Sequence, residues 1–230
     1  MFDALFTTTT EYQKLSHALS GKGACALFGL PASGRAQVYA ALCRQLDKPL
    51  CIVTPGEAEA TRFAADLNTL GIPAAVFPAR DYVLRPIEGT AREYEYRRLA
   101  VLGELVGGRL RAVAVPAEAL TQFTTPKEDF CANTRTLHTG DTLLRDDLLA
   151  ALFGAGYTRR AQVDGPGQFS VRGDIVDIFA PDQKMPVRME FWGDEIDTLH
   201  TFDLTTQRRE DAIDKFYLSP AREVLFGKPA

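Results

Sequence analysis

The first half of the chain alternates between two patterns of apolar and polar positions. Short apolar runs bounded by glycine or proline are typical of buried parallel strands, and stretches with an apolar residue every three or four positions are typical of helices. The short runs predict strands at residues 24–28, 50–53, 74–77 and 112–115. The longer stretches predict helices at residues 11–19, 36–46, 57–70 and 91–106. This order predicts a doubly wound α/β domain with a parallel sheet.

The pattern changes after about residue 121. Residues 121–130 are polar with one proline, which is typical of a linker, and residues 143–155 have helical spacing before Gly156. Closely spaced runs then predict strands at residues 158–163, 168–172, 174–179, 187–192 and 195–202. Turns rich in glycine, proline and aspartate separate these runs, so we expect a smaller α+β domain with an antiparallel sheet.

Residues 29–36, which read GLPASGRA, have the glycine spacing of a phosphate-binding loop. Gly29 and Gly34 flank four residues, and the two positions that follow normally hold lysine and a hydroxyl residue. Here they hold Arg35 and Ala36. A predicted strand precedes the loop and a predicted helix follows it, which is where folds of this class bind ligands.

Arg35 and Ala36 replace the two residues on which nucleotide binding by such a loop normally depends. The lysine normally bridges the outer phosphates and the hydroxyl holds Mg²⁺, but the guanidinium of Arg35 is bulkier than an ammonium and Ala36 has no oxygen. Pro31 also removes one backbone donor. A plain strand-to-helix turn, a degenerate phosphate loop and an active loop all stay open, and the substitutions disfavour the active one.

These patterns divide the chain. We expect a degenerate P-loop-NTPase-like α/β domain with a parallel sheet over residues 1–122, and an α+β antiparallel domain over residues 123–220.

The two faces of the second predicted sheet differ in chemistry. Alternate residues of a strand point to opposite sides, so one face is apolar and packs on the predicted helix. The other face mixes arginine, acidic and aromatic residues, namely Arg172, Phe179, Arg188, Glu190 and Trp192. Arginine with exposed aromatics is typical of protein–protein hot spots, and a solvated face with cross-strand ion pairs is the alternative. No nucleophile–base pair can be assembled there, so we predict no catalytic residue.

Composition narrows the function classes. Hydrophobic residues make up 46% of the 230 residues, and the formal net charge of −4 argues against coating DNA or an anionic membrane by bulk charge. No apolar run approaches the roughly 18 residues of a membrane span, and the N-terminus lacks a secretory signal. The 4 cysteines and 3 histidines are scattered, so we expect reduced thiols, no metal site and a cytoplasmic location.

The second domain also carries a family resemblance. It lies in Gly156-Tyr157, in QFSVRGD at 168–174, in Ile178-Phe179, in RMEF at 188–191 and in GDEI at 193–196. These residues resemble domain 2 of the UvrB-like module at the N-terminus of the bacterial transcription-repair coupling factor (Mfd) family, and UvrB shares the pattern. The first domain resembles domain 1A of that module more weakly, through its α/β order and the loop at 29–36.

Three departures from UvrB favour the coupling factors. UvrB has an intact phosphate loop, an arginine at the position of Ser170, and a long DNA-clamping hairpin. Here only residues 77–90 separate the third predicted strand from the next helix, which is too short for that hairpin.

The resemblance implies a non-enzymatic adaptor that binds UvrA and recruits it to a stalled RNA polymerase in nucleotide excision repair. The residues carried over as UvrA contacts are Arg159, Arg172, Phe179, Arg188 and Glu190. At this length the resemblance implies an N-terminal fragment without a cofactor, in which residues 221–230 begin a return to the first domain. The resemblance implies that ATP, Mg²⁺, DNA and RNA polymerase bind to other domains of the family, which this fragment lacks.

Two other function classes stay open. One is a nucleotide-binding ATPase or helicase-type domain with an unorthodox arginine-containing phosphate loop. The other is a DNA-binding module that uses Arg80, Arg85, Arg92, Arg97 and Arg98. The acidic net charge and the missing hairpin argue against direct DNA binding by this fragment.

Overall fold

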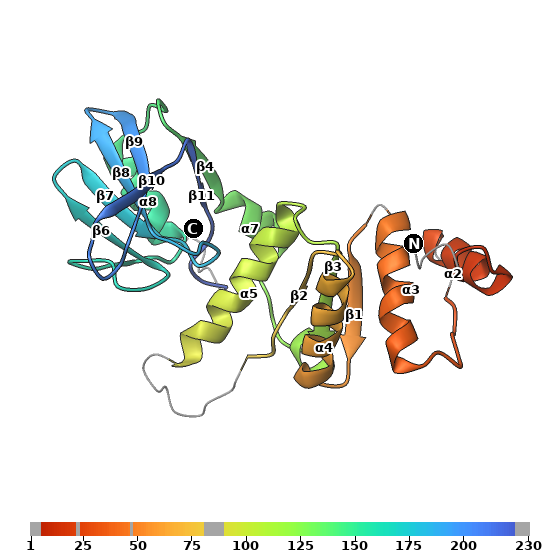
Figure 1. The fold of residues 1–230 in the computed structure, drawn as a ribbon. Helices are drawn as coiled ribbons and strands as arrows, with labels where there is room; N and C mark the ends of the chain where they lie inside the picture. Colours follow the sequence, from red (N-terminus) through yellow and green to blue (C-terminus); the bar gives the residue numbers. More distant parts are fainter. Residues whose placement is uncertain (1–5, 22–23, 47, 81–89, 224–230) are drawn as a thin grey trace. The chain divides into compact units, whose positions relative to one another are not determined.

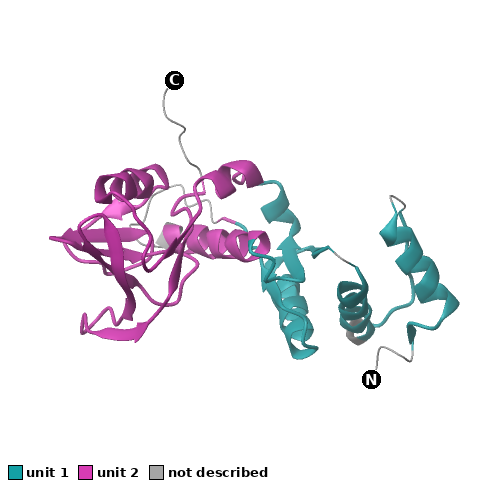
Figure 2. Ribbon diagram, turned by 90° about the horizontal axis from the view of Figure 1, so that it is seen from above, with its two compact units in different colours: residues 1–79, 107–122 teal, residues 80–106, 123–230 magenta. Residues whose placement is uncertain are grey.

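The computed structural model describes residues 6–21, 24–46, 48–80 and 90–223. Contacts within the chain divide it into two compact units, coloured separately in Figure 2. The first comprises residues 1–79 and 107–122, and the second comprises residues 80–106 and 123–230. Like the predicted domains, the units divide at residue 122, but the contacts place residues 80–106 with the second unit.

The first unit is built on a parallel sheet of three strands. These are β1 (Leu50–Thr54), β2 (Ala74–Val76) and β3 (Ala112–Pro116), in the order β1-β3-β2 (Figure 1). Helix α4 (Glu57–Thr69) packs on the sheet, because its residues Phe63 and Leu67 share a buried cluster with Ile52 of β1. The strands and helix predicted for these segments are confirmed.

Two further helices precede the sheet. Helix α2 (Thr10–Ser20) begins after Thr9, whose hydroxyl oxygen accepts a hydrogen bond from the backbone N–H of Tyr12, and helix α3 (Ala32–Gln45) follows the loop at 29–31. Leu15 of α2 and Leu42 of α3 belong to one buried cluster, so the two helices stabilise each other. Both predicted helices are confirmed, and α3 begins four residues earlier than predicted.

The strand predicted at residues 24–28 is wrong. The structure describes these residues, and they form no strand and no backbone hydrogen bond with the sheet. The side chain of Phe28 is 88% exposed and that of Leu27 is 44% exposed. A short apolar run indicates a tendency to be buried, but it does not specify a partner strand, and a strand exists only where its backbone groups are paired.

The second unit holds a six-stranded sheet in the order β10-β9-β8-β7-β6-β5. Its strands are β5 (Thr158–Arg159), β6 (Gln168–Arg172), β7 (Ile175–Phe179), β8 (Val187–Trp192), β9 (Glu195–Phe202) and β10 (Arg209–Ala212). All pairs are antiparallel except β5 with β6, which is parallel and differs from the antiparallel sheet predicted. The predicted strands from 168 to 202 are confirmed, whereas β5 is shorter than predicted and β10 was not predicted.

A second, two-stranded sheet joins β4 (Arg135–His138) to β11 (Lys215–Leu218). Helix α8 (Arg145–Gly154) packs on one face of the larger sheet and confirms the helix predicted there. Leu148 and Leu152 of α8, Phe169 and Met189 of the larger sheet, and Phe216 of β11 are in one buried cluster. The apolar face predicted from residue alternation is therefore the core of this unit.

The remaining described helices are α5 (Thr90–Val106), α6 (Ala117–Leu120) and α7 (Lys127–Ala132). Helix α5 confirms the helix predicted from residue 91, and α7 occupies part of the predicted linker, with Phe130 buried. The architecture is mixed α/β, with a parallel sheet in one unit and largely antiparallel sheets in the other. No helix in the described ranges is long and apolar enough to cross a membrane.

Candidate functional site: the polar face of the six-stranded sheet

The face of the larger sheet away from α8 carries the candidate site. Strand register aligns Asp177 with both Ser170 and Arg188, and it aligns Glu190 with Ile175. Paired residues of adjacent strands point to the same side, so charged side chains from β6, β7 and β8 meet on this side. We call the set Arg172, Asp177, Arg188, Glu190 and Arg209 the polar face.

Asp177 is the centre of the polar face. Its side chain is fully buried, and its two carboxylate oxygens accept hydrogen bonds from two arginines. Arg188 donates from Nε at 2.7 Å and from Nη2 at 2.9 Å, and Arg172 donates from Nη2 at 2.7 Å. Hydrogen bonds between charged partners are the strong ones, so one carboxylate fixes the position of both guanidinium groups.

The side chain of Arg188 is buried beneath the polar face. It is 9% exposed, its Nη1 donates to the carbonyl oxygen of Gln207 at 3.2 Å, and its guanidinium lies 4.7 Å from the ring centroid of Phe202. The hydrogen bonds to Asp177 raise the pKa of Arg188; burial opposes that shift, and the negative charge of Asp177 adds to it. Arg188 therefore supports the polar face from below and exposes little of itself.

Arg172 is the part of this cluster that faces solvent. Its side chain is 47% exposed, and its bond to Asp177 uses only one of the five N–H donors of a guanidinium. The remaining donors are available to a partner, while the buried carboxylate holds the group in place. A half-exposed, pre-positioned arginine is suited to binding a carboxylate in a fork.

Glu190 and Arg209 form a second ion pair on the polar face. Arg209 lies on β10 and donates from Nη2 to Glu190, and Thr198 of β9 donates its hydroxyl to the same carboxylate at 3.2 Å. Arg209 was not predicted as a site residue. All four residues of β10 are exposed, so no apolar alternation marked this strand in the sequence.

The two aromatic residues predicted for this face differ in exposure. Phe179 is 6% exposed and packs with Val163 and Phe202, so it is not an exposed contact as predicted. Trp192 is 82% exposed. A role for Phe179 in binding stays a prediction.

Arg159 lies apart from the other predicted residues. It is exposed on the edge strand β5 and is paired in register with Phe169, whose side chain is in the core beneath α8. The register therefore places Arg159 on the opposite side of the sheet from Arg172.

Three of the arginines predicted for DNA binding contact other side chains of the second unit. Arg80 and Arg98 both pair with Glu223, and the guanidinium of Arg97 lies 5.7 Å from the ring centroid of Tyr94. Arg92 is exposed. Arg85 lies outside the described residues.

The loop at 29–36 leads directly into helix α3, and two of its backbone N–H groups are bonded within the chain. Helix α3 begins at Ala32, and the N–H groups of Gly34 and Arg35 donate to the carbonyl oxygen of Pro31 at 2.9 and 3.2 Å. Arg35 lies 3.8 Å from Glu59, and Ala36 is 4% exposed. Gly29 has φ of +81°, so a tight turn leads into the helix. Among the described residues, no group of His, Cys, Asp and Glu side chains is arranged to hold a metal ion.

Comparison with known proteins identifies the same region. Residues 136–224 match the family described as the UvrB interaction domain. This match contains the polar face and the core beneath it.

Curated relatives match most of the chain, and each is named transcription-repair-coupling factor. The protein from Mycobacterium tuberculosis is 36% identical over 91% of this chain, and that from Myxococcus xanthus is 35% identical over 86%. The Bacillus subtilis protein is 28% identical over 86% of this chain. The chain spans 17% of the length of each of these three relatives. Residues 136–224 of the second unit are therefore similar to the UvrB interaction domain, and most of the chain is similar to part of the transcription-repair-coupling factors.

Proposed function

We propose that this chain is a docking module that binds UvrA through the polar face of its second unit. The observation that carries the proposal is the geometry of Arg172, a half-exposed arginine held by the buried carboxylate of Asp177. Holding the guanidinium in advance lowers the entropy lost when a partner binds it. The family description of residues 136–224 supports the same assignment.

The chemistry of the face indicates how it would contact UvrA. Arginines outnumber carboxylates on the polar face, and Arg188 and Asp177 neutralise each other inside it. Arg172 is left with donors that point to solvent, which suits an acidic side chain of UvrA. Glu190 and Arg209, already paired, would add polar contacts beside it. Arg159 and Phe179 stay proposed contacts, Arg159 from the sheet edge and Phe179 only if the face rearranges.

The experiment is a binding titration of purified UvrA with the wild-type chain and with Arg172→Ala. Truncation of an interface anchor costs about 2 kcal/mol or more, so we expect affinity to fall about thirtyfold. The matched control is Arg135→Ala, because Arg135 is equally a surface arginine of the second unit but lies on β4 of the other sheet. Equal affinity of Arg172→Ala and wild type would refute the site assignment.

A wider role follows from the relatives. We propose that the chain acts in transcription-coupled nucleotide excision repair, as an adaptor that brings UvrA to a stalled RNA polymerase. Contacts with RNA polymerase and DNA, and any use of ATP and Mg²⁺, belong in this proposal to other parts of a longer protein. A cytoplasmic location fits this role.

We also propose that residues 29–36 are a degenerate phosphate loop and that this chain is not itself an enzyme. The glycine spacing supports descent from such a loop, and the helix that begins at Ala32 uses N–H groups that a phosphate would need. The rival function is an ATPase with an arginine-containing loop. Calorimetry can measure MgATP binding directly. Saturable binding at micromolar concentration would favour the ATPase.

A further inference from the structure

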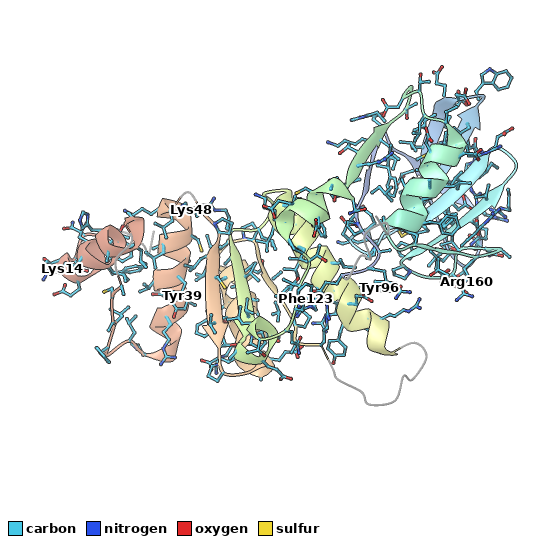
Figure 3. The ribbon with its side chains drawn as sticks, turned by 180° about the vertical axis from the view of Figure 1, so that it is seen from behind. Lys14, Tyr39, Lys48, Tyr96, Phe123 and Arg160 are labelled. Atoms are coloured by element: carbon cyan, nitrogen blue, oxygen red, sulfur yellow. The ribbon has the colours of Figure 1, made fainter. Side chains whose placement is uncertain are left out.

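Outside the ion-pair cluster, the residue of the second unit that most clearly indicates a binding surface is Trp192, at the end of β8. Its side chain is 82% exposed, more than any other large apolar side chain described in the second unit. The next most exposed is Phe123 at 68% (labelled in Figure 3). Exposing an indole to water is unfavourable, and tryptophan is among the residues most enriched in interface hot spots.

Trp192 lies on the same side of the sheet as the polar face. Its neighbour Phe191 is buried in the core beneath α8, so alternation along β8 directs Trp192 to the opposite side, with Glu190. Only one residue separates Trp192 from Glu190 along the strand. The indole therefore extends the polar face toward the β8–β9 turn.

The turn that carries Trp192 is held on both sides. On one side, the N–H of Phe191 donates to the carbonyl oxygen of Asp174 at 2.9 Å. On the other side, the N–H of Leu143 donates to the carbonyl oxygen of Asp194 at 2.7 Å, and the N–H of Gly140 donates to that of Ile196 at 2.8 Å. A tryptophan on a fixed backbone has few torsions left to order, so little entropy is lost when a partner covers it.

The charges around Trp192 are acidic. Asp194, Glu195 and Asp197 are all exposed, and none of them forms an ion pair with another described residue. Asp174 is also exposed, although it pairs with Arg145 at 3.0 Å. Arg172 lies two strands away at the same end of the sheet, because it pairs in register with Ile175, which pairs with Glu190. The surface therefore places an exposed arginine on β6 beside an acidic region around Trp192.

We propose that Trp192 is an aromatic anchor for UvrA, and that UvrA receives it in an apolar recess bordered by lysine or arginine side chains. This inference rests on the proposed function, because it assigns a second contact to the same docking surface. The acidic residues around the β8–β9 turn supply the charge complementarity. Arg172 on β6 and the acidic residues around Trp192 on β8 give the surface neighbouring acid-binding and base-binding parts, which limits the orientations in which UvrA can dock.

The first experiment compares UvrA affinity for wild type, Trp192→Ala, Trp192→Phe and the control Phe123→Ala. We expect Trp192→Ala to weaken binding at least tenfold, Trp192→Phe to fall between it and wild type, and Phe123→Ala to bind as wild type. Because the indole is exposed, the melting temperature of Trp192→Ala should equal that of wild type, which separates binding from folding. The double variant Asp194→Asn/Glu195→Gln should bind more weakly than wild type at low salt, and the difference should shrink as salt is added.

The second experiment uses the fact that the chain has a single tryptophan. Incorporating 5-fluorotryptophan places one fluorine at Trp192, and unlabelled UvrA contributes no fluorine signal. We expect the resonance to move when UvrA is added, because the indole leaves water. In the Arg172→Ala background, saturating UvrA should produce the same final shift, since the two contacts are separate.

The outcomes distinguish this inference from the function on which it rests. If the wild-type chain fails to bind UvrA, the proposed function is refuted. If wild type binds and Arg172→Ala does not, while Trp192→Ala binds as wild type and the fluorine resonance stays in place, the docking function stands and the anchor is refuted.

Discussion

Arg98 and Glu223 form a fully buried ion pair, although 125 residues separate them in the sequence. Nη2 of Arg98 lies 2.8 Å from Oε1 of Glu223, and Nε lies 2.8 Å from Oε2. Both residues belong to the second unit, where this bidentate pair fastens helix α5 to the segment that follows β11. This contact is one of those that join residues 80–106 to the rest of the second unit.

Further bonds converge on the same glutamate. Nη2 of Arg80 lies 2.7 Å from Oε2, and the hydroxyl of Thr125 donates to the backbone carbonyl of Glu223. The backbone N–H of Glu223 donates to Oε1 of Glu95 on α5 at 2.8 Å. Glu223 therefore links Arg80, helix α5 and Thr125 to the segment that follows β11.

Removing this carboxylate should destabilise the second unit strongly. In Glu223→Ala the buried guanidinium of Arg98 loses its counter-charge, and breaking one side of a buried ion pair costs about 3–5 kcal/mol. Urea unfolding followed by circular dichroism measures the loss. Glu128→Ala on the exposed surface of α7 is the control and should change the free energy of unfolding by no more than about 0.5 kcal/mol. A loss in Glu223→Ala as small as the control's would contradict a stabilising role.

The same pair predicts acid sensitivity. Burial by itself raises the pKa of Glu223, but hydrogen bonds from Arg98, Thr124 and Arg80 and the charge of Arg98 outweigh it, so the pKa lies below its usual value. The stability from this lowered pKa is present above the unfolded-state pKa of about 4.3, and it is lost as pH falls through the folded-state pKa. Thermal melts from pH 7 to pH 3 should show a smaller acid-induced loss in Glu223→Gln than in wild type. Parallel curves for the two proteins would exclude Glu223 as the source.

The sequence predicted the elements whose residues alternate clearly, and it missed those whose residues do not. Strands β6 to β9 place one face in the core, so their apolar residues recur at every second position. Strand β10 is exposed along its length and shows no such pattern. The run at 24–28 has a strand-like composition, yet its pairing depends on residues distant in sequence, which local composition does not encode.

The candidate site was predictable as a face but not as a network. Alternation placed Arg172, Arg188 and Glu190 on one side of the sheet. It could not show that Asp177 is fully buried between two arginines, or that Arg188 is nearly as buried. Burial on the polar side depends on neighbouring strands and on the loop that carries Gln207, and those contacts are long-range.

The two arginines that share Asp177 should differ sharply in their effect on stability. Arg188→Ala leaves a buried carboxylate with only one partner and should lower the free energy of unfolding by about 3–5 kcal/mol. Arg172→Ala removes a half-exposed partner, and screening by solvent limits its cost to about 1 kcal/mol or less. Urea unfolding of both variants tests this difference. Equal destabilisation would mean that Arg172 is as structural as Arg188.

Gly156, between α8 and β5, should tolerate no side chain. Its φ is +85°, and an added Cβ would lie 2.8 Å from Cβ of Arg222 and still closer to its Cγ. Gly156→Ala therefore combines backbone strain with a steric clash, and we expect a loss of about 2 kcal/mol or more. Gly193 has φ of +63° with nothing within 4 Å of the added Cβ, so Gly193→Ala should lose only about 1 kcal/mol. Thermal unfolding of the pair isolates the clash, and similar losses in both would argue against it.

Restoring the usual residues of a phosphate loop should not restore nucleotide binding. Arg35→Lys/Ala36→Thr supplies the missing lysine and hydroxyl, but helix α3 already begins at Ala32 and uses the N–H groups of Gly34 and Arg35. No strand among the described residues leads into the loop. Position 36 is only 4% exposed and lies on the same face of α3 as Ala40 and Cys43 of the core shared with the sheet, so the added hydroxyl would be buried. We expect no heat of MgATP binding above that of wild type by calorimetry, together with a lower melting temperature from the buried threonine. Micromolar binding by the double variant would show that side-chain identity, rather than backbone form, is what this loop lacks.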